Sequence, residues 1–236
     1  WASDASVTKG RRYSIRTYPS GETEGITIGG HAAELGYSKI ASFYVVSDYA
    51  QSVHRGLLQS KVKNEVIFNQ EIPSGLLDFR ALLLRARSLE VKALFACLDV
   101  GQAAVLARQA GELRMPLNFF GCENLNSLDE LKAAEGALDS AWLVSAGVNE
   151  DFRRRYRAAF GNEDVLSAAA IHYDLVRVLT SLPAKRRSGE ELIAAIMSSP
   201  IPSGGGVLQG EFRKTSTDQF LDLKLIVKAM SELRGQ

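Results

Sequence analysis

Residues 39–46 read Lys-Ile-Ala-Ser-Phe-Tyr-Val-Val, an apolar and β-branched run that is typical of a buried strand. Four similar runs follow, and segments with helical periodicity lie before and between them. The expected strands span residues 39–46, 65–71, 91–98, 117–122 and 139–146. The expected helices span residues 21–35, 49–62, 76–89, 100–113 and 128–134. This alternation predicts an α/β fold, a doubly wound parallel sheet with flanking helices.

Polar residues mark several expected helix starts. Asp48 and Asp99 precede the helices at 49 and 100, where a carboxylate can accept backbone N–H groups as an N-cap. Ser127 precedes the helix at 128, and Glu130 follows three residues later, which is the spacing of a capping box. For Asp99, the N-cap is favoured over a ligand contact.

The pattern changes after Gly147. Three helices are expected in a row, at 149–160, 165–182 and 189–198, with no strand between them. Residues 200–207 are rich in Pro, Ser and Gly and indicate a linker. Residues 221–230 resemble one strand. Residues 210–213 are a candidate partner for it. Because these helices lack a sheet to cover, we expect them to expose an apolar face or to be covered by another chain.

Composition excludes several classes of function. The chain has 236 residues, of which 46% are hydrophobic, and its 28 basic and 27 acidic residues give a net charge of +1. This balance does not favour nucleic-acid binding, and no apolar run reaches the length of a membrane span. The first residues show neither a signal peptide nor an initiator Met, which favours a processed or truncated product.

Residues that could carry chemistry are scattered. His31, His54 and His172 form no i,i+4 pair, and residues 204–206 lack the Lys of a phosphate loop, so neither a metal nor a cofactor is expected. No nucleophile stands beside a plausible base, which argues against an enzyme. Cys97 and Cys122 end two consecutive strands, and both a disulfide and two buried free thiols remain open.

Ten short motifs, in order along the chain, resemble the branched-chain amino-acid-binding branch of the type I periplasmic binding proteins, the solute receptors of ABC transporters. They are Ala5-Ser6, Ile15-Arg16-Thr17-Tyr18-Pro19-Ser20, Lys39-Ile40-Ala41, Asp48-Tyr49-Ala50, Asp78-Phe79, Arg108-Gln109-Ala110-Gly111, Gly121-Cys122-Glu123, Phe152-Arg153-Arg154-Arg155-Tyr156, Tyr173-Asp174 and Gly210-Glu211-Phe212. The family's Tyr-Gly is Tyr49-Ala50 here. The loop after Leu98 is shorter than in the branched-chain binder, whose aromatic ligand contact has no counterpart.

The resemblance implies two α/β lobes. Members of this family carry a long additional segment before the position of Ala5, which supplies most of the first lobe. Residues 11–146 with 207–236 are therefore expected to form the complete second lobe. Residues 1–10 with 147–206 are expected to be the remnant of the first lobe, which accounts for the helices that lack a sheet.

The resemblance also implies ligand-binding residues. Glu123 matches a Glu that contacts the ligand ammonium, and it lies just past a strand end, where ligands of open α/β sheets bind. Ser6, with Ala5 beside it, matches the residues that bind the ligand carboxylate. Tyr49 either closes over the ligand or packs against the next helix. Leu98 and Asp99 complete the candidate contacts.

The function implied is an extracytoplasmic receptor that binds an amino acid, or a related small amide or carboxylate, and delivers it to a membrane permease. The expected location is periplasmic, or extracellular and anchored to a membrane. A cytoplasmic ligand sensor of the same fold is the alternative, and an α/β enzyme with an unrecognised site is a third interpretation. The expected partners are the small ligand, the permease and a chain covering helices 149–198.

Overall fold

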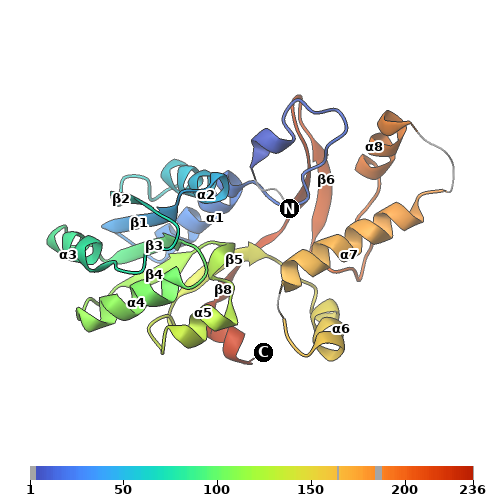
Figure 1. Ribbon diagram of the computed structural model, residues 1–236. Helices are drawn as coiled ribbons and strands as arrows, with labels where there is room; N and C mark the ends of the chain where they lie inside the picture. Colours follow the sequence, from blue (N-terminus) through green and yellow to red (C-terminus); the bar gives the residue numbers. More distant parts are fainter. Residues whose placement is uncertain (1–3, 164, 184–187, 236) are drawn as a thin grey trace. The chain divides into compact units, whose positions relative to one another are not determined.

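The computed structural model describes residues 4–163, 165–183 and 188–235 (Figure 1). The chain forms two compact units, each built from two separate segments. One, which we call the helical unit, comprises Trp1–Ser20 and Ala146–Ile226, and the other, the sheet unit, comprises Gly21–Ser145 and Val227–Gln236. Residues 1–3, 164, 184–187 and 236 of the expected lobes lie outside the described residues.

These boundaries differ from the expected ones at two segments. Residues 11–20 and 207–226 were expected beside the parallel sheet, but they belong to the helical unit. The reason is apolar packing, since Tyr18, Phe212 and Leu221 share one buried cluster with Ile171 and Val178. These residues give the helices of that unit a surface on which to pack.

The sheet unit is built on six strands. They are β1 Ile40–Val45, β2 Val66–Ile72, β3 Ala93–Cys97, β4 Asn118–Gly121, β5 Trp142–Ala146 and β8 Leu225–Ala229. The strand order is β2-β1-β3-β4-β5-β8, and the pairs from β2 to β5 are parallel. Phe43, Phe95 and Phe120 are fully buried in its core. The predicted α/β class with a parallel sheet is confirmed.

Five α-helices and two short 3-10 helices accompany these strands. They are α1 Gly21–Glu34, α2 Asp48–Gln59, α3 Arg80–Ser88, α4 Gln102–Glu112, η2 Glu123–Leu125, α5 Leu128–Ala133 and η3 Met230–Gly235. The backbones of α1 and α2 are in contact. A Cβ on Gly25 would lie 2.0 Å from the Val53 carbonyl oxygen, and one on Gly56 would lie 2.2 Å from the Glu22 carbonyl oxygen. Only glycine permits this approach.

Two predicted helix caps are wrong. Ser47, not Asp48, caps α2, because its Oγ accepts the Ala50 N–H at 3.2 Å. At α4 the N-cap residue is Gly101, so Asp99 does not cap the helix.

The orphan N–H groups at the start of α4 are satisfied from another helix. The buried Glu130 carboxylate of α5 accepts the N–H groups of Gly101 and, at 2.8 Å, Ala104. Ser127 caps α5 as predicted, but Glu130 serves α4 rather than completing the capping box.

The helical unit contains η1 Ala5–Val7, α6 Glu150–Phe160, α7 Leu166–Ser181, α8 Gly189–Met197 and an antiparallel pair, β6 Gly210–Lys214 with β7 Gln219–Leu223. The single strand expected at 221–230 is two strands. The chain changes partners at Lys224, whose N–H donates to the Gln209 carbonyl and whose carbonyl accepts from Gly147 N–H. Thereafter β8 joins the six-stranded sheet.

The segment 200–207 ends in a packed turn rather than a free linker. The N–H groups of Gly206 and Val207 each donate to one carboxylate oxygen of the buried Asp174 of α7, both at 2.8 Å. A Cβ on Gly206 would lie 2.2 Å from the Ala170 carbonyl oxygen. The glycine therefore lets the turn lie directly on α7.

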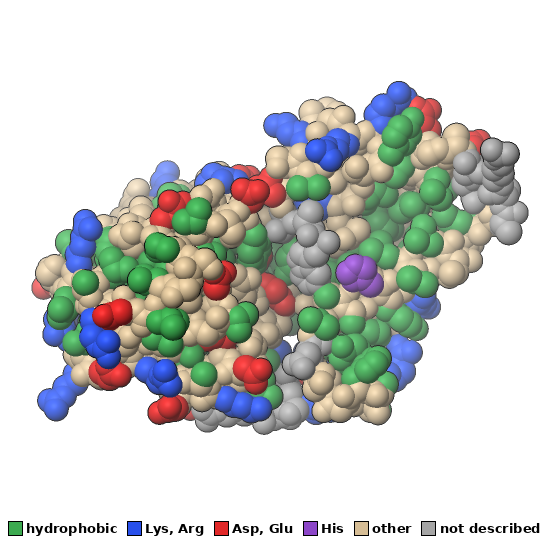
Figure 2. Space-filling view, in the orientation of Figure 1, with side chains coloured by type: hydrophobic (Ala, Val, Ile, Leu, Met, Phe, Trp, Pro, Cys, Tyr) green, Lys and Arg blue, Asp and Glu red, His purple; other side chains and the backbone are tan. Residues whose placement is uncertain are grey.

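An apolar face is exposed on these helices, as predicted. Val176 and Leu179 of α7 are 58% and 49% exposed, and Phe160 of α6 and Leu192 of α8 are also exposed. None of the described residues of α8 is buried. In Figure 2, hydrophobic side chains gather on the surface over this part of the chain.

Candidate functional site

The carboxyl ends of three neighbouring strands bring most of the predicted ligand residues to one edge of the sheet unit. Strand β1 ends at Val45, and Tyr49 lies in the first turn of α2. Strand β3 ends just before Leu98 and Asp99, and β4 ends just before Cys122 and Glu123. Since β1, β3 and β4 are consecutive in the sheet, these residues share the edge where open α/β sheets bind ligands.

Tyr49 and Glu123 are joined through a residue that the sequence analysis did not single out. Glu24 of α1 is fully buried, and both of its carboxylate oxygens lie within 3.0 Å of the Tyr49 hydroxyl, which donates to them. Oxygen Oε1 also accepts the backbone N–H of Glu123 at 2.9 Å. One carboxyl group therefore fixes the two predicted ligand residues relative to each other.

The environment of Glu24 favours its neutral form. The pKa of Glu24 is raised to about 8, chiefly by burial and also by the nearby Glu123 carboxylate, while the bonds from Glu123 N–H and Tyr49 act in the opposite direction. Among the residues that the structure describes, no Lys or Arg pairs with Glu24. A carboxyl group with such a pKa can change charge near neutral pH.

The Glu123 side chain is half-buried at the start of η2. Its Oε1 accepts a hydrogen bond from Asn126 Nδ2 at 3.0 Å. An adjacent carboxylate oxygen, oriented by a neighbouring amide, is suited to accept charge-assisted bonds from an ammonium group. The arrangement can therefore hold a cationic end of a small solute.

Leu98 and Asp99 contribute differently. The Leu98 side chain is buried, and its carbonyl oxygen accepts from Asn124 Nδ2 at 3.0 Å. Asp99 accepts a hydrogen bond from the Ser74 hydroxyl at 2.8 Å. The structure thus places Asp99 at the strand edge in a contact with a neighbouring loop.

The two cysteines also lie at this edge, and both are free and buried. Burial raises the pKa of the Cys97 thiol well above its usual value, and the neighbouring Cys122, Glu24 and Asp99 act in the same direction. Cys97 is therefore a neutral thiol that packs beneath the site, which agrees with the second of the two alternatives.

Ser6 and Ala5 lie in η1 of the helical unit. Ser6 is exposed, and its backbone N–H donates to the Asp4 carboxylate at 2.7 Å. This contact is local and leaves the Ser6 hydroxyl on the surface of that unit.

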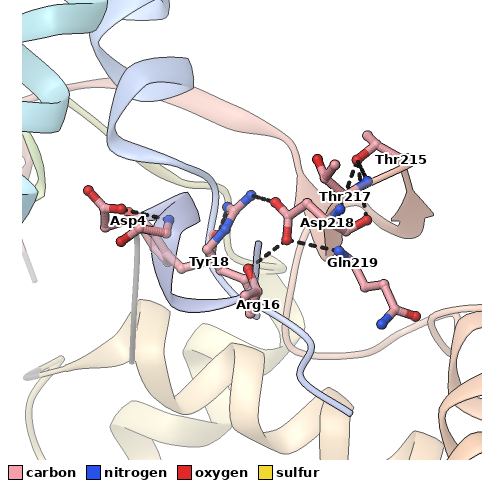
Figure 3. A network of polar contacts seen from close by, with 9 residues as sticks. Asp4, Arg16, Tyr18, Thr215, Thr217, Asp218 and Gln219 are labelled. Carbon is pink, nitrogen blue, oxygen red and sulfur yellow. Dashed lines mark hydrogen bonds and ion pairs between the residues drawn. The ribbon is translucent and has the colours of Figure 1, made fainter. Parts of the chain in front are cut away.

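A second polar cluster holds the helical unit together (Figure 3). Arg16 is buried, and it donates to the Tyr18 carbonyl oxygen at 2.6 Å and to the Asp218 carboxylate at 3.0 Å. Asp218 also accepts from the Thr8 hydroxyl at 2.5 Å and from the N–H of Gln219. Here the acid, whose side chain is 12% exposed, has a cationic partner, and the cluster ties the N-terminal segment to the turn after β6.

A groove of about 570 Å³ lies beside this cluster in the helical unit. Arg11, Arg12, Lys214 and Thr215 are among its lining residues, and none of the predicted ligand residues lines it. Arg12 already pairs with Glu190 at the surface. The groove is therefore distinct from the strand edge that carries Tyr49 and Glu123.

Comparison with known proteins defines the class. Residues 2–221 match the family described as "Periplasmic binding protein", so the chain belongs to that family. No curated protein is recognisably similar to it in sequence. None of the described helices has the length and apolar character that a membrane crossing requires.

Solved structures share the fold at low sequence identity. A leucine-binding protein LivK from Thermotoga maritima matches with a TM-score of 0.78 and 18% identity, over 95% of this chain and 67% of that one. LivJ from Streptococcus pneumoniae, in complex with isoleucine, matches at 0.73 and 17%, over 94% and 71%. A solute-binding protein from R. palustris with benzoate matches at 0.73 and 16%, over 97% and 66%. The chain thus spans about two thirds of these structures, 65% of one from Rhodospirillum rubrum and as little as 39% of another similar structure.

Glu24 left a weak signal in the sequence. Gly21, Gly25 and Gly29 recur every four residues along one face of α1, which indicates close helix packing, and Glu24 lies beside that face. A charged residue in the first turn of a helix is usually solvated and favoured by the helix dipole. The sequence alone therefore predicts a solvated carboxylate at Glu24, and not the buried carboxyl group that the structure shows.

Proposed function

We propose that this chain belongs to an extracytoplasmic receptor that binds an amino acid, or a related small amide or carboxylate, for an ABC transporter. The observation that carries the proposal is the meeting of Tyr49 and Glu123 at the carboxyl edge of the sheet, held by Glu24. Two similar proteins were solved with isoleucine and with benzoate, solutes of this size and chemistry.

In this proposal Glu123 accepts the ligand ammonium, and Tyr49 closes over the ligand beside it. Ser6, with the backbone at Ala5, binds the ligand carboxylate, and Leu98 and Asp99 border the side-chain pocket. The sheet unit serves as the second lobe and α6–α8 as part of the first. The receptor acts outside the cytoplasm and delivers its solute to a membrane permease.

The exposed apolar face of α7 and α8 fits the same proposal. About a third of each similar structure lies outside the part that this chain matches. We propose that polypeptide of that kind, an α/β segment of the first lobe, covers Val176, Leu179 and Leu192 in the working receptor. An apolar face of this kind otherwise favours association between molecules.

The test is a thermal-shift panel of the amino acids and small aromatic acids on the complete gene product. A solute that binds the native state raises the unfolding midpoint, and the stabilisation grows with the logarithm of its concentration relative to Kd. We expect one class of solute to give a shift, and Glu123→Gln to weaken its binding by tenfold or more, about 1.4 kcal/mol.

The matched control is Glu135→Gln, which removes an exposed carboxylate paired with Arg108 in the same unit. Binding should be unchanged in this variant. A panel without any shift, or equal binding by Glu123→Gln and the wild type, would contradict the proposal. A secretory signal in the upstream gene sequence would distinguish a transport receptor from a cytoplasmic sensor.

A further inference from the structure

Glu24 is held in place by the tightest helix contact of the sheet unit. It lies in α1 next to Gly25. The backbone of Val53 in α2 lies so close to Gly25 that a side chain would not fit there. Gly56 of α2 approaches the Glu22 carbonyl in the same way. Because the two backbones touch, the Cα of Glu24 is held close to α2.

The two oxygens of Glu24 connect three elements. Tyr49, from the first turn of α2, donates its hydroxyl at 2.9 Å to Oε2 and 3.0 Å to Oε1. The Glu123 N–H, at the start of η2, donates to Oε1. These two donors belong to residues 25 and 99 positions away in the chain. One carboxyl group therefore contacts both residues and links α2 to η2.

Three titratable groups face Glu24 from the elements around it. Tyr49 approaches from α2, Glu123 from η2 and Cys97, in contact with Cys122, from β3. The Glu123 carboxylate repels a negative charge on Glu24, and the neutral Cys97 thiol offers no positive charge to balance it. Ionisation of Glu24 would strengthen the hydrogen bonds that it accepts, because charge-assisted bonds are roughly twice as strong as neutral ones.

We propose that Glu24 is a positioning residue of the solute site, which holds Tyr49 and the Glu123 loop together and binds both more tightly when it is ionised. The proposal rests on the proposed solute-binding function, because only then do Tyr49 and Glu123 form a site. Glu24 itself is buried and acts through the two residues that it holds.

The experiment follows the Glu123 amide by ¹⁵N-¹H NMR in the ligand-free protein between about pH 5 and pH 9. The pKa of Glu24 is about 8, so the Glu123 amide signal should titrate in that range, well above an ordinary carboxyl group. Glu24→Gln keeps the size and an acceptor oxygen but has no charge to gain. It should abolish this titration and leave the Glu123 amide at a constant position.

Glu135→Gln, an exposed carboxylate variant, is the control and should leave the titration intact. A Glu123 amide that does not titrate in the wild type, or that titrates equally in Glu24→Gln, would overturn the proposal. The wild-type measurement decides the matter even if the variant does not fold. A failed solute panel would remove the proposed function alone, because the amide titration requires no ligand.

Discussion

Each unit holds an acidic group with little or no exposure to solvent, and the two units do so in opposite ways. In the helical unit, Asp218 is paired with the Arg16 guanidinium and bound by Thr8 and Gln219. In the sheet unit, Glu24 has hydroxyl and amide donors but no cation among its described partners. A buried charge needs a compensating partner, whereas a carboxyl group without one takes a proton instead. The first cluster therefore contains a charged, ion-paired carboxylate, whereas the acid of the second can gain or lose a proton near neutral pH.

The largest effect should follow from breaking the ion pair. Arg16→Met leaves Asp218 nearly buried without its cation, and we expect the free energy of unfolding to fall by about 3–5 kcal/mol in chemical denaturation. Arg12→Met removes the exposed pair with Glu190 and should cost about 1 kcal/mol at most. Equal losses in the two variants would show that burial does not distinguish these pairs.

An intermediate effect should follow from the acid without a cation. Its folded pKa of about 8 exceeds the unfolded value of 4.5, so the native state holds the proton over a range where the unfolded state has lost it. Stability from Glu24 is therefore complete below about pH 4.5 and decreases as pH rises toward 8, by up to about 1.4 kcal/mol per pH unit.

The measurement is the difference in unfolding free energy between the wild type and Glu24→Gln across that range. Taking the difference cancels the contributions of Glu130, whose pKa is also raised by burial, and of His54, whose pKa burial lowers to about 4. The variant should gain stability relative to the wild type as pH rises. A difference that is constant with pH would mean that folding does not change the pKa of Glu24.

The smallest effect on stability should come from the exposed apolar face of the helical unit. Val176→Ser with Leu179→Ser should change the unfolding free energy by only about 0.5 kcal/mol or less per site. The same pair should reduce concentration-dependent association of the 236-residue chain in sedimentation experiments. Leu84→Ser, at an exposed apolar residue of α3, is the control. Equal association of the double variant and the wild type would contradict the idea that this apolar face is a docking surface.

The sequence predicted the layers of the fold well, because the central strands of the sheet carry strong apolar runs. The expected strands at 39–46 and 91–98 contain β1 and β3, and the helices at 149–160 and 165–182 contain α6 and α7. These patterns depend on burial alone and can be recognised in the local sequence.

The errors arose where a distant residue decides the local structure. The chain at 221–230 changes partners at Lys224 because β6 pairs with the first part and the parallel sheet takes the second. Glu24 was missed because its partners, Tyr49 and Glu123, are far away in sequence. The sequence predicted which strand ends lie at the same edge of the sheet. It did not predict that the Glu24 carboxyl group joins the residues there.

The cap that Glu130 provides for α4 has a consequence for how the chain folds. The Ala104 N–H is satisfied by a residue 26 positions later, so α4 carries no complete start signal in its own sequence. Helices of this length, 11 residues, are marginal in water by themselves. We therefore expect the first turn of α4 to become stable only when α5 has docked against it. Amide hydrogen exchange should then show α4, β4 and α5 protected as one unit.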